Sequence, residues 1–453
     1  MKTNMITGNP LKQITLFSIP IIVGNIFQQF YQVIDTLIVG RYVGVDALAA
    51  LGVTGPIGFT LIGFAIGIST GFTVIVSQRF GANDDEGVRK SIAMTILATL
   101  FCSIALTLIS YFATRPLLLL ISTPENILDL SESYFKIIVY GIVSIMYYNT
   151  FSSILRAIGD SKTPLYFLIL SSFLNVVGDY ICVAILHWGV EGAAIATVFS
   201  QSFSAILSLI FIIKKYPEIW PQKDDWKYDG NMIKRLFVIG IPSGFHVSVI
   251  SIGVLIVQAN LNAFGSEAVA GFGVGVRIES LFVQSFVGFG AGLTTYCGQN
   301  IGAMQVDRVK EGVRKTLFLT SFLAIINGII LYFFSANIAA LFIDSHDSQV
   351  IQYTVTYTQT VGKFFVALTL IFIYRSSCQG LGSGVIPMFC AFEEIVFRVV
   401  AIIFIVPTFG YIGLCLASPF SWIATGLSVF VFYKILLKKI DKALSENKAL
   451  KIY

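Results

Sequence analysis

Twelve long apolar stretches, separated by short polar segments, dominate this chain of 453 residues. Their centres lie near Gly24, Ile62, Thr99, Ser144, Asn175, Val198, Ile250, Gln284, Ala324, Val366, Val399 and Leu427. About 20 mostly apolar residues are enough for a helix to cross a bilayer. The pattern therefore predicts an all-α membrane protein with twelve transmembrane helices.

The composition excludes most soluble classes of protein. Only 12% of the residues are charged, whereas 56% are hydrophobic. A soluble domain carries about 25% charged residues, so a cytosolic enzyme, a disordered chain and a nucleic-acid binder are all excluded. The cysteines lie inside apolar runs without a C-x-x-C pair, which indicates packing and not a disulfide or metal site.

The distribution of Lys and Arg predicts the orientation of the chain in the membrane. Of the 30 Lys and Arg residues, most lie in segments on the same side as the N-terminus, whereas Arg41 and Arg115 alone lie in the opposite segments. Because basic loops stay in the cytoplasm, we expect both termini to be cytoplasmic. The first apolar run has no small-residue cleavage site and is expected to be a retained helix.

The two halves of the chain resemble each other, which indicates a duplication. The matching pairs include Val43–Ala49 with Phe264–Ala270, Gln78–Ala82 with Gln299–Ala303, and Gly87–Lys90 with Gly312–Lys315. We expect an N-terminal lobe over residues 1–213, a cytoplasmic linker over 214–235, and a C-terminal lobe over 236–453 with a short basic tail. Six helices in each half make the repeats parallel, so two six-helix lobes would surround a central cavity suited to alternating access. The alternative is a duplication that only builds a scaffold.

No sequence feature supports ATP hydrolysis or another enzyme activity. The chain has no G-x-x-x-x-G-K-[ST] phosphate loop, no H-E-x-x-H or comparable metal set, and no second acidic pair to join Asp84–Glu86. An intramembrane enzyme is the alternative, but it would need such a constellation. We therefore expect neither an enzyme nor a prosthetic cofactor, and no dependence on an ATPase partner.

A polar stripe runs along the first membrane segment. At 100° per residue its side chains fall within half of the helix circumference, which indicates a face lining a wet cavity. The stripe contains Asn25, Gln28, Tyr31, Gln32 and Asp35. Pro20 lies before the stripe and removes one helical hydrogen bond, so it is a candidate hinge.

Three membrane segments of the first half bring polar side chains to similar depth. At about 1.5 Å per residue, Asp35 and Thr197 lie about 9 Å and Asp179 about 12 Å below the outer boundary. Asn175 lies one turn deeper, on the same face as Asp179. Two carboxyls there could hold a proton, or share a Na⁺ with oxygens of Asn175 and Thr197. The alternative for Asp179 is a packing role between helices.

The second half carries a different set of charges near the middle of the membrane. These are Arg277, Glu279, Lys363, Arg398 and the acidic pair Glu393 and Glu394. Three bases balance three acids, which favours a structural ion-pair network. The alternative is that Arg277, Glu279, Lys363 and Arg398 line a substrate cavity or form a second proton site.

Together these features resemble the multidrug and toxic compound extrusion (MATE) family. The resemblance rests on the duplication, on Gln78-x-x-Gly81-Ala82 with its echo Gln299-x-x-Gly302-Ala303, and on Arg156-Ala157-x-Gly159-Asp160. It implies an antiporter that exports organic, mostly cationic and aromatic compounds in exchange for H⁺ or Na⁺. It also implies a cation site of the DinF-type branch at Tyr31, Asp35, Asn175, Asp179 and Thr197.

The sequence differs from the MATE family at one point that bears on the class of substrate. The other main bacterial branch has an acidic residue in its seventh helix, and Ser243–Asn262 contains none. The basic residues of the second half leave a flippase for lipid-linked oligosaccharides, of the same superfamily, as the alternative. We expect a multi-pass protein of a bacterial cell membrane, monomeric, with small organic molecules and membrane lipid as its partners. The sequence does not decide between H⁺ and Na⁺.

Overall fold

The computed structural model describes residues 5–342 and 348–446, and every regular element in these ranges is a helix. Packing divides the chain into two units. Unit 1 comprises Ile19–Ser248 and Gly302–Met304, and unit 2 comprises Met5–Ser18, Val249–Ile301 and the described residues from Gln305 onward. This division passes through α1 (Pro10–Tyr42) and α8 (Gly230–Leu261), and it separates Gly302 from the rest of the helix that begins at Ser266. The lobe boundaries predicted at 213 and 236 lie inside helices, near the end of the helix Gly189–Lys215 and near the start of α8, and they stay a prediction.

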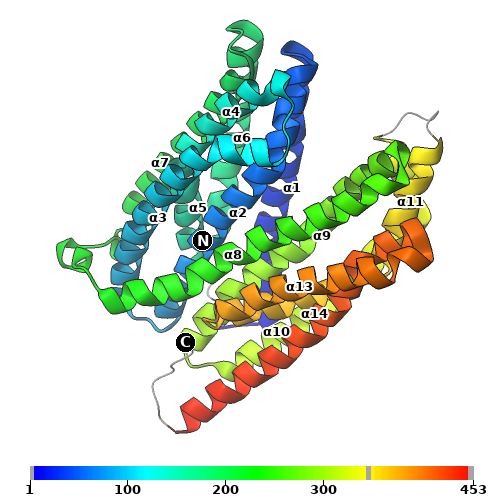
Figure 1. The fold of residues 1–453 in the computed structure, drawn as a ribbon. Helices are drawn as coiled ribbons and strands as arrows, with labels where there is room; N and C mark the ends of the chain where they lie inside the picture. Colours follow the sequence, from blue (N-terminus) through cyan, green and yellow to red (C-terminus); the bar gives the residue numbers. More distant parts are fainter. Residues whose placement is uncertain (1–4, 343–347, 447–453) are drawn as a thin grey trace. The chain divides into compact units, whose positions relative to one another are not determined.

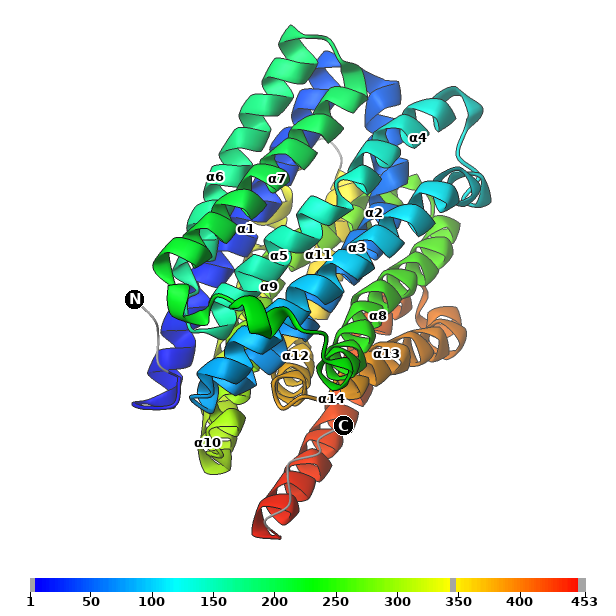
Figure 2. The same cartoon turned by 90° about the vertical axis from the view of Figure 1, so that its left-hand side faces the viewer.

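Unit 1 is a bundle built on α2, the longest helix in this part of the chain (Figure 1). Besides parts of α1 and α8, it contains α2 (Val45–Gly81), α3 (Asp85–Leu120), α4 (Glu125–Tyr140), α5 (Ile142–Ala157), α6 (Lys162–Asp179) and α7 (Gly189–Lys215). Its main apolar core joins α2, α3, α5 and the first half of α8 through Phe72, Met94, Met146 and Leu236. Figure 2 shows α6 and α7 side by side, and the two helices pack along their length.

Small residues allow the helices of unit 1 to approach closely. A Cβ on Gly67 of α2 would lie 2.5 Å from the carbonyl oxygen of Ser243 in α8, so no larger residue fits there without movement. Such close backbone contacts are a usual means of packing helices in membranes, where apolar side chains gain little by leaving lipid. The position of α8 against α2 therefore depends on glycine.

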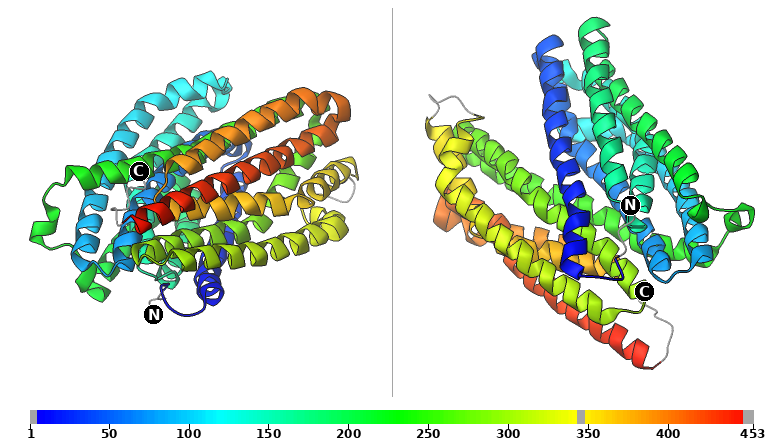
Figure 3. Two further views of the ribbon diagram at one scale, coloured as in Figure 1. Left: turned by 90° about the horizontal axis from the view of Figure 1, so that it is seen from below. Right: turned by 180° about the vertical axis from the view of Figure 1, so that it is seen from behind.

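Unit 2 contains the other six long elements. These are α9 (Ser266–Gly302), α10 (Val306–Ala339), α11 (Ser348–Gly362), α12 (Phe365–Gly380), α13 (Val385–Phe404) and α14 (Val406–Ser445). The left view of Figure 3 shows α13 beside α14, and these two helices pack extensively. The apolar core of this unit includes Val257, Phe286, Phe365 and Trp422.

Hydrogen bonds from Arg308 and Asn300 attach the first described residues to the rest of unit 2. The guanidinium of Arg308 donates hydrogen bonds to the carbonyl oxygens of Gly8 at 2.9 Å and Met5 at 3.2 Å. Asn300 also donates to the Met5 carbonyl, at 3.0 Å. These bonds explain why Met5–Ser18 belongs to unit 2, although the rest of α1 belongs to unit 1.

Each of the twelve predicted apolar stretches is present as a helix or a bent helix pair. Nine helices among the described residues are long and apolar enough to cross a membrane, and the bent pairs α4–α5 (44°) and α11–α12 (54°) raise the number to eleven. The remaining stretch is α13, which carries Glu393, Glu394 and Arg398. The predicted all-α fold class is confirmed, and the sides of the membrane that the termini face stay a prediction.

The linker between the halves folds back onto α3. It contains the short helices η2 (Pro217–Ile219) and η3 (Lys223–Trp226). Arg89 donates to Asp225 at 3.1 Å, and Lys90 donates to Asp229 at 2.9 Å. The backbone N–H of Met232, together with Lys90, holds the pKa of Asp229 below its usual value. The last part of the predicted basic tail, 447–453, lies outside the described residues.

Candidate functional site

Three helices of unit 1 meet where the sequence predicts the cation site. A Cβ on Gly24 would lie 3.1 Å from Cδ2 of Leu168, which places α1 close against α6. A Cβ on Gly178 would lie 3.0 Å from the Cβ of Ala196, so α6 and α7 are equally close. The neighbours of these two small residues in sequence are Asp179 and Thr197. The glycine therefore brings the polar side chains of α6 and α7 together.

The predicted polar residues form one connected group. The amide nitrogen of Asn175 donates to Oγ1 of Thr197 at 3.2 Å and approaches Oδ1 of Asp179 at 3.5 Å. The carboxyls of Asp35 and Asp179 lie close enough to interact electrostatically. Two ionised carboxylates repel each other, so a proton or a cation between them would stabilise the pair.

Three oxygen atoms in this group have no hydrogen-bond partner. They are Oδ1 of Asp35, Oδ1 of Asn175 and Oδ2 of Asp179. Asn175 and Asp179 are buried. Buried polar atoms almost always have a partner, so three unpaired acceptors in one place indicate a site for a donor or a cation. Oxygen ligands of this kind suit hard cations.

A transition-metal centre is not indicated. Among residues 5–342 and 348–446, no group of three or more His, Cys, Asp or Glu side chains is placed to hold a metal ion. The site has two carboxyls, one amide and one hydroxyl. A proton or an alkali cation is therefore a better match for it than a divalent or softer metal.

Tyrosines extend the group on two sides. The hydroxyl of Tyr31 lies near Gln28 and Gln32 of its own helix and interacts electrostatically with Asp35 and Asp179. Tyr134 of α4 interacts with the same two carboxyls. Tyr134 was not predicted from the sequence. It follows Glu132, at the edge of a polar break, by two residues, so its depth of about 3 Å does not match that of Thr197.

The helix changes type at the acidic residue. Asp179 is the last residue of α6, and a π-helix, η1 (Tyr180–Ile185), follows at once. Such π-helical turns are rare and frequently occur at functional sites. The ring of Tyr180 packs edge-on against that of Tyr42 at the end of α1, with centroids 6.0 Å apart. This turn could not be predicted, because apolar periodicity does not distinguish an α-helix from a short π-helix.

Asn25 and Pro20 lie earlier on α1 than Tyr31 and Asp35. Asn25 is half-buried, and Pro20 is buried within α1, which continues as a helix through the proline. The boundary between the two units falls between Ser18 and Ile19, next to Pro20. The hinge at Pro20 stays a prediction.

Unit 2 pairs part of its charge internally. The guanidinium of Arg398 lies 3.5 Å from the carboxylate of Glu394, one turn earlier on α13, and both side chains are buried. The hydroxyl of Tyr357 donates to Glu279, and that of Ser428 donates to Glu393 at 2.7 Å. Each of Arg398, Glu279 and the two acidic residues of α13 thus has a polar partner, although Oε2 of Glu393 and Nε of Arg398 have none.

Arg277 and Lys363 differ from these residues. Both side chains are exposed, and neither forms an ion pair within the described part of the chain. The ammonium of Lys363 lies 5.6 Å from the ring centroid of Tyr332. The predicted ion-pair network thus includes Arg398 but not these two cations.

A duplicated set of membrane-spanning helices with a buried carboxyl pair defines a multi-pass membrane transporter. The MatE family model matches the chain twice, over residues 20–181 and 242–405. The chain belongs to the MatE family. It is a transporter and not an enzyme, as predicted, and the double match confirms the duplication.

Named relatives and solved structures are similar over most of the chain. The probable multidrug resistance protein YpnP of Bacillus subtilis (strain 168) is 30% identical over 378 residues, covering 83% of this chain and 84% of its own. The probable multidrug resistance protein YoeA of the same organism is 30% identical over 346 residues, 74% of each chain. The outward-facing structure of a multidrug resistance MATE family transporter has a TM-score of 0.91 at 22% identity, covering 97% of this chain and 98% of that one.

Proposed function

We propose that the protein is a secondary active exporter that exchanges H⁺ or Na⁺ for small organic, mostly cationic compounds. The names of YpnP and YoeA as probable multidrug resistance proteins support export of this kind. We place the protein in the bacterial cell membrane, as a monomer that needs neither a prosthetic cofactor nor an ATPase partner. Both termini are cytoplasmic in this proposal, and two lobes related by the duplication give access to one side of the membrane at a time.

The observation that carries the proposal is the Asp35–Asp179 pair, which together with Asn175 has three unpartnered oxygens. An ionisable group inside a bilayer is costly and usually marks a transport pathway. The pair links α1 to the end of α6, so a proton or Na⁺ bound there neutralises charge between two helices. A change of charge at such a contact can favour one of two conformations, and this would couple ion movement to export.

The coupling role is tested with purified protein in vesicles. A ΔpH and a ΔpNa are imposed separately, and the movement of a fluorescent organic cation is followed. We expect one gradient to drive the exchange, and we expect Asp35→Asn and Asp179→Asn to reduce that exchange by about tenfold or more, the usual size of a coupling between sites.

Asp46→Asn is the matched control, because Asp46 is an exposed carboxylate at the start of α2. It should transport like the wild type. Undiminished exchange in both Asp35→Asn and Asp179→Asn would remove the coupling role from this pair. Proton release or ²²Na⁺ binding without substrate tests the ion site independently of the choice of cargo.

The exposed cations of unit 2 favour a second candidate, a flippase for lipid-linked oligosaccharides. Arg277 and Lys363 would attract an anionic diphosphate and repel a cationic drug. The discriminating experiment reconstitutes the protein with a fluorescent lipid-linked sugar and measures its movement between leaflets. Movement that is reduced in Arg277→Gln and Lys363→Gln, with no export of organic cations, would favour the flippase.

A further inference from the structure

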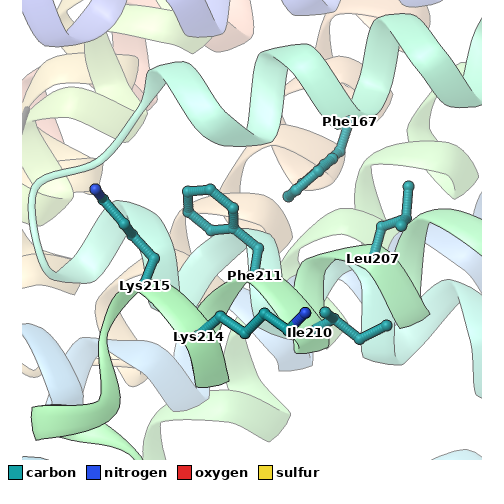
Figure 4. Close-up of a pocket in the computed structure, with 6 residues that line it drawn as sticks. All are labelled: Phe167, Leu207, Ile210, Phe211, Lys214 and Lys215. Carbon is teal, nitrogen blue, oxygen red and sulfur yellow. The ribbon is translucent and has the colours of Figure 1, made fainter.

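A groove on the surface of unit 1 combines an apolar wall with a cationic end. It lies between α6 and α7 and has a volume of about 340 Å³ (Figure 4). Its lining consists of Phe167, Leu207, Ile210, Phe211, Lys214 and Lys215. The rings of Phe167 and Phe211 pack edge-on, with centroids 5.7 Å apart. Phe167 lies eight residues before Asn175 on α6, so the groove is separate from the carboxyl site.

The groove opens on the face of α7 that meets lipid. An exposed apolar stripe runs along this helix at three- and four-residue steps, the spacing of a single helix face. Its members are Phe199, Phe203, Ile206, Ile210 and Ile213. In a membrane-spanning helix such an uncovered apolar face contacts acyl chains. The apolar wall of the groove is therefore available to a hydrocarbon chain from the surrounding bilayer.

The end of the groove is positively charged. Lys214 and Lys215 form the last turn of α7 and are both exposed, and Figure 4 shows their side chains extending to either side of Phe211. The carboxylate of Asp160 is buried and accepts hydrogen bonds from the hydroxyls of Thr163 and Tyr216. Lysine clusters where a helix leaves the membrane are typical of sites for anionic headgroups.

We propose that this groove binds one anionic phospholipid. One acyl chain would lie along Phe167, Leu207 and Ile210, and the phosphate of the headgroup would contact Lys214 and Lys215. Two cations disfavour a cationic drug at this position. A zwitterionic lipid carries no net charge and would gain less from the lysines. The proposal requires only a protein in a bilayer and does not depend on the cargo or coupling ion.

Lipid retention on the full-length protein tests the proposal. Protein in detergent is mixed with phosphatidylglycerol or phosphatidylcholine of identical acyl chains, and bound lipid is measured by native mass spectrometry. We expect preferential retention of phosphatidylglycerol, with a loss of about 5-fold for each of Lys214→Gln and Lys215→Gln, because one lysine near an anionic surface contributes that factor. Added salt should reduce the preference.

The matched control is Lys438→Gln with Lys439→Gln, an exposed lysine pair near the end of α14. This variant should retain phosphatidylglycerol at the groove as the wild type does. Conservative variants Lys214→Arg and Lys215→Arg, which keep the charge, should also retain it. A variant that fills the groove, Ile210→Trp, should lower retention although both lysines remain.

Three outcomes would overturn the proposal. One is equal retention of the two lipids by the wild type. Another is an equal loss in the α14 control, which would indicate general attraction to basic surface. The third is full displacement of phosphatidylglycerol by millimolar inorganic phosphate, which would indicate an anion site without a role for the acyl chain. The melting temperature of each variant checks that the exposed substitutions leave the fold intact.

Discussion

Asp35 lies fifteen residues after Pro20 in the first half of the chain, and Val257 lies fifteen residues after Pro242 in the second. Pro20 and Pro242 are the first residues of the two matches to the same family model. Asp35 and Val257 therefore occupy equivalent positions in the two halves. In the same way Asp179 follows Pro164 by fifteen residues, and Ile402 follows Pro387 by fifteen.

These equivalent positions meet in both units, but with different chemistry. In unit 1 the carboxyls of the two aspartates interact electrostatically with each other. In unit 2, Val257 and Ile402 belong to one apolar cluster. The duplicated fold thus brings the same two positions together twice, and only the first copy uses them for ionisable groups. Ion coupling in our proposal therefore belongs to unit 1.

A third position extends the comparison. Asn175 and Arg398 each lie eleven residues after the matched prolines. The amide of Asn175 has an unpartnered oxygen beside the two aspartates, whereas Arg398 forms an ion pair with Glu394. An arginine remains charged under all physiological conditions. Unit 2 therefore has a permanent cation where unit 1 has a neutral group that can accept a donor or a cation.

The largest expected effect comes from exchanging the chemistry of the two units. Val257→Asp would place a carboxylate in the apolar core of unit 2, where Val257 is 4% exposed. A charge at the centre of a membrane helix costs about 2.5–3.5 kcal/mol even on the more lenient scale. We expect a comparable loss of stability, measured as a lower melting temperature in detergent.

The reverse substitution, an apolar residue in place of an aspartate of unit 1, should not lower the melting temperature. Asp35→Val removes an unpaired acceptor from unit 1, and we expect it to leave the melting temperature unchanged or raised while export stops. Val257→Thr, which adds only a hydroxyl, is the milder control in unit 2. An unchanged melting temperature of Val257→Asp would contradict the prediction that position 257 is apolar where position 35 is polar.

A smaller loss of stability is expected when the hydrogen bond to the Glu279 carboxylate of unit 2 is removed. Tyr357→Phe removes the hydroxyl that donates to Glu279. Leaving a buried acceptor without its donor costs about 1–3 kcal/mol, so the melting temperature should fall. Tyr353→Phe on the same helix is the control, since Tyr353 accepts the hydroxyl of Tyr411 through its backbone carbonyl and not through its own ring. Equal losses in both variants would show that only ring packing matters at Tyr357.

The fold could be predicted from the sequence almost completely. Long apolar stretches have few structural solutions in a bilayer, so each of the twelve became a helix or a bent pair. The bends did not follow from the pattern. Both α4–α5 and α11–α12 contain enough apolar residues for one straight span, and the apolar count carries no information about a break near Gly141 or Phe364.

The candidate site could be predicted in part. Equal depth along three helices selected Asp35, Asp179 and Thr197, because the rise per residue is fixed. That the carboxyls face each other depends on the rotation of each helix, which is set by packing at residues such as Gly178 and Ala196. Tyr134 and the π-helix after Asp179 were missed for the same reason, since both depend on how neighbouring helices fit together.

The smallest expected effect concerns two equivalent lysines that form different ion pairs in the two halves of the chain. In the first half, Lys90 of α3 pairs with Asp229 of the linker at 2.9 Å. In the second half, the equivalent Lys315 of α10 pairs with Glu311 on its own helix at 2.6 Å. Of these two ion pairs, only Lys90–Asp229 connects a helix to the linker. Asp229→Asn should therefore increase hydrogen exchange of the linker backbone, whereas Glu311→Gln should leave its local backbone unchanged.

The pH dependence of this attachment follows from the lowered pKa of Asp229. A carboxyl whose pKa is lower in the folded state stabilises that state at every pH above its unfolded value of about 3.9. The contribution disappears as the pH falls through the lower, folded value. The linker should thus exchange at a constant rate between pH 5 and 8, after correction for intrinsic rates, and loosen only below about pH 4. In Asp229→Asn this acid transition should be absent, and a transition of unchanged size would assign the attachment to Arg89 and Asp225 instead.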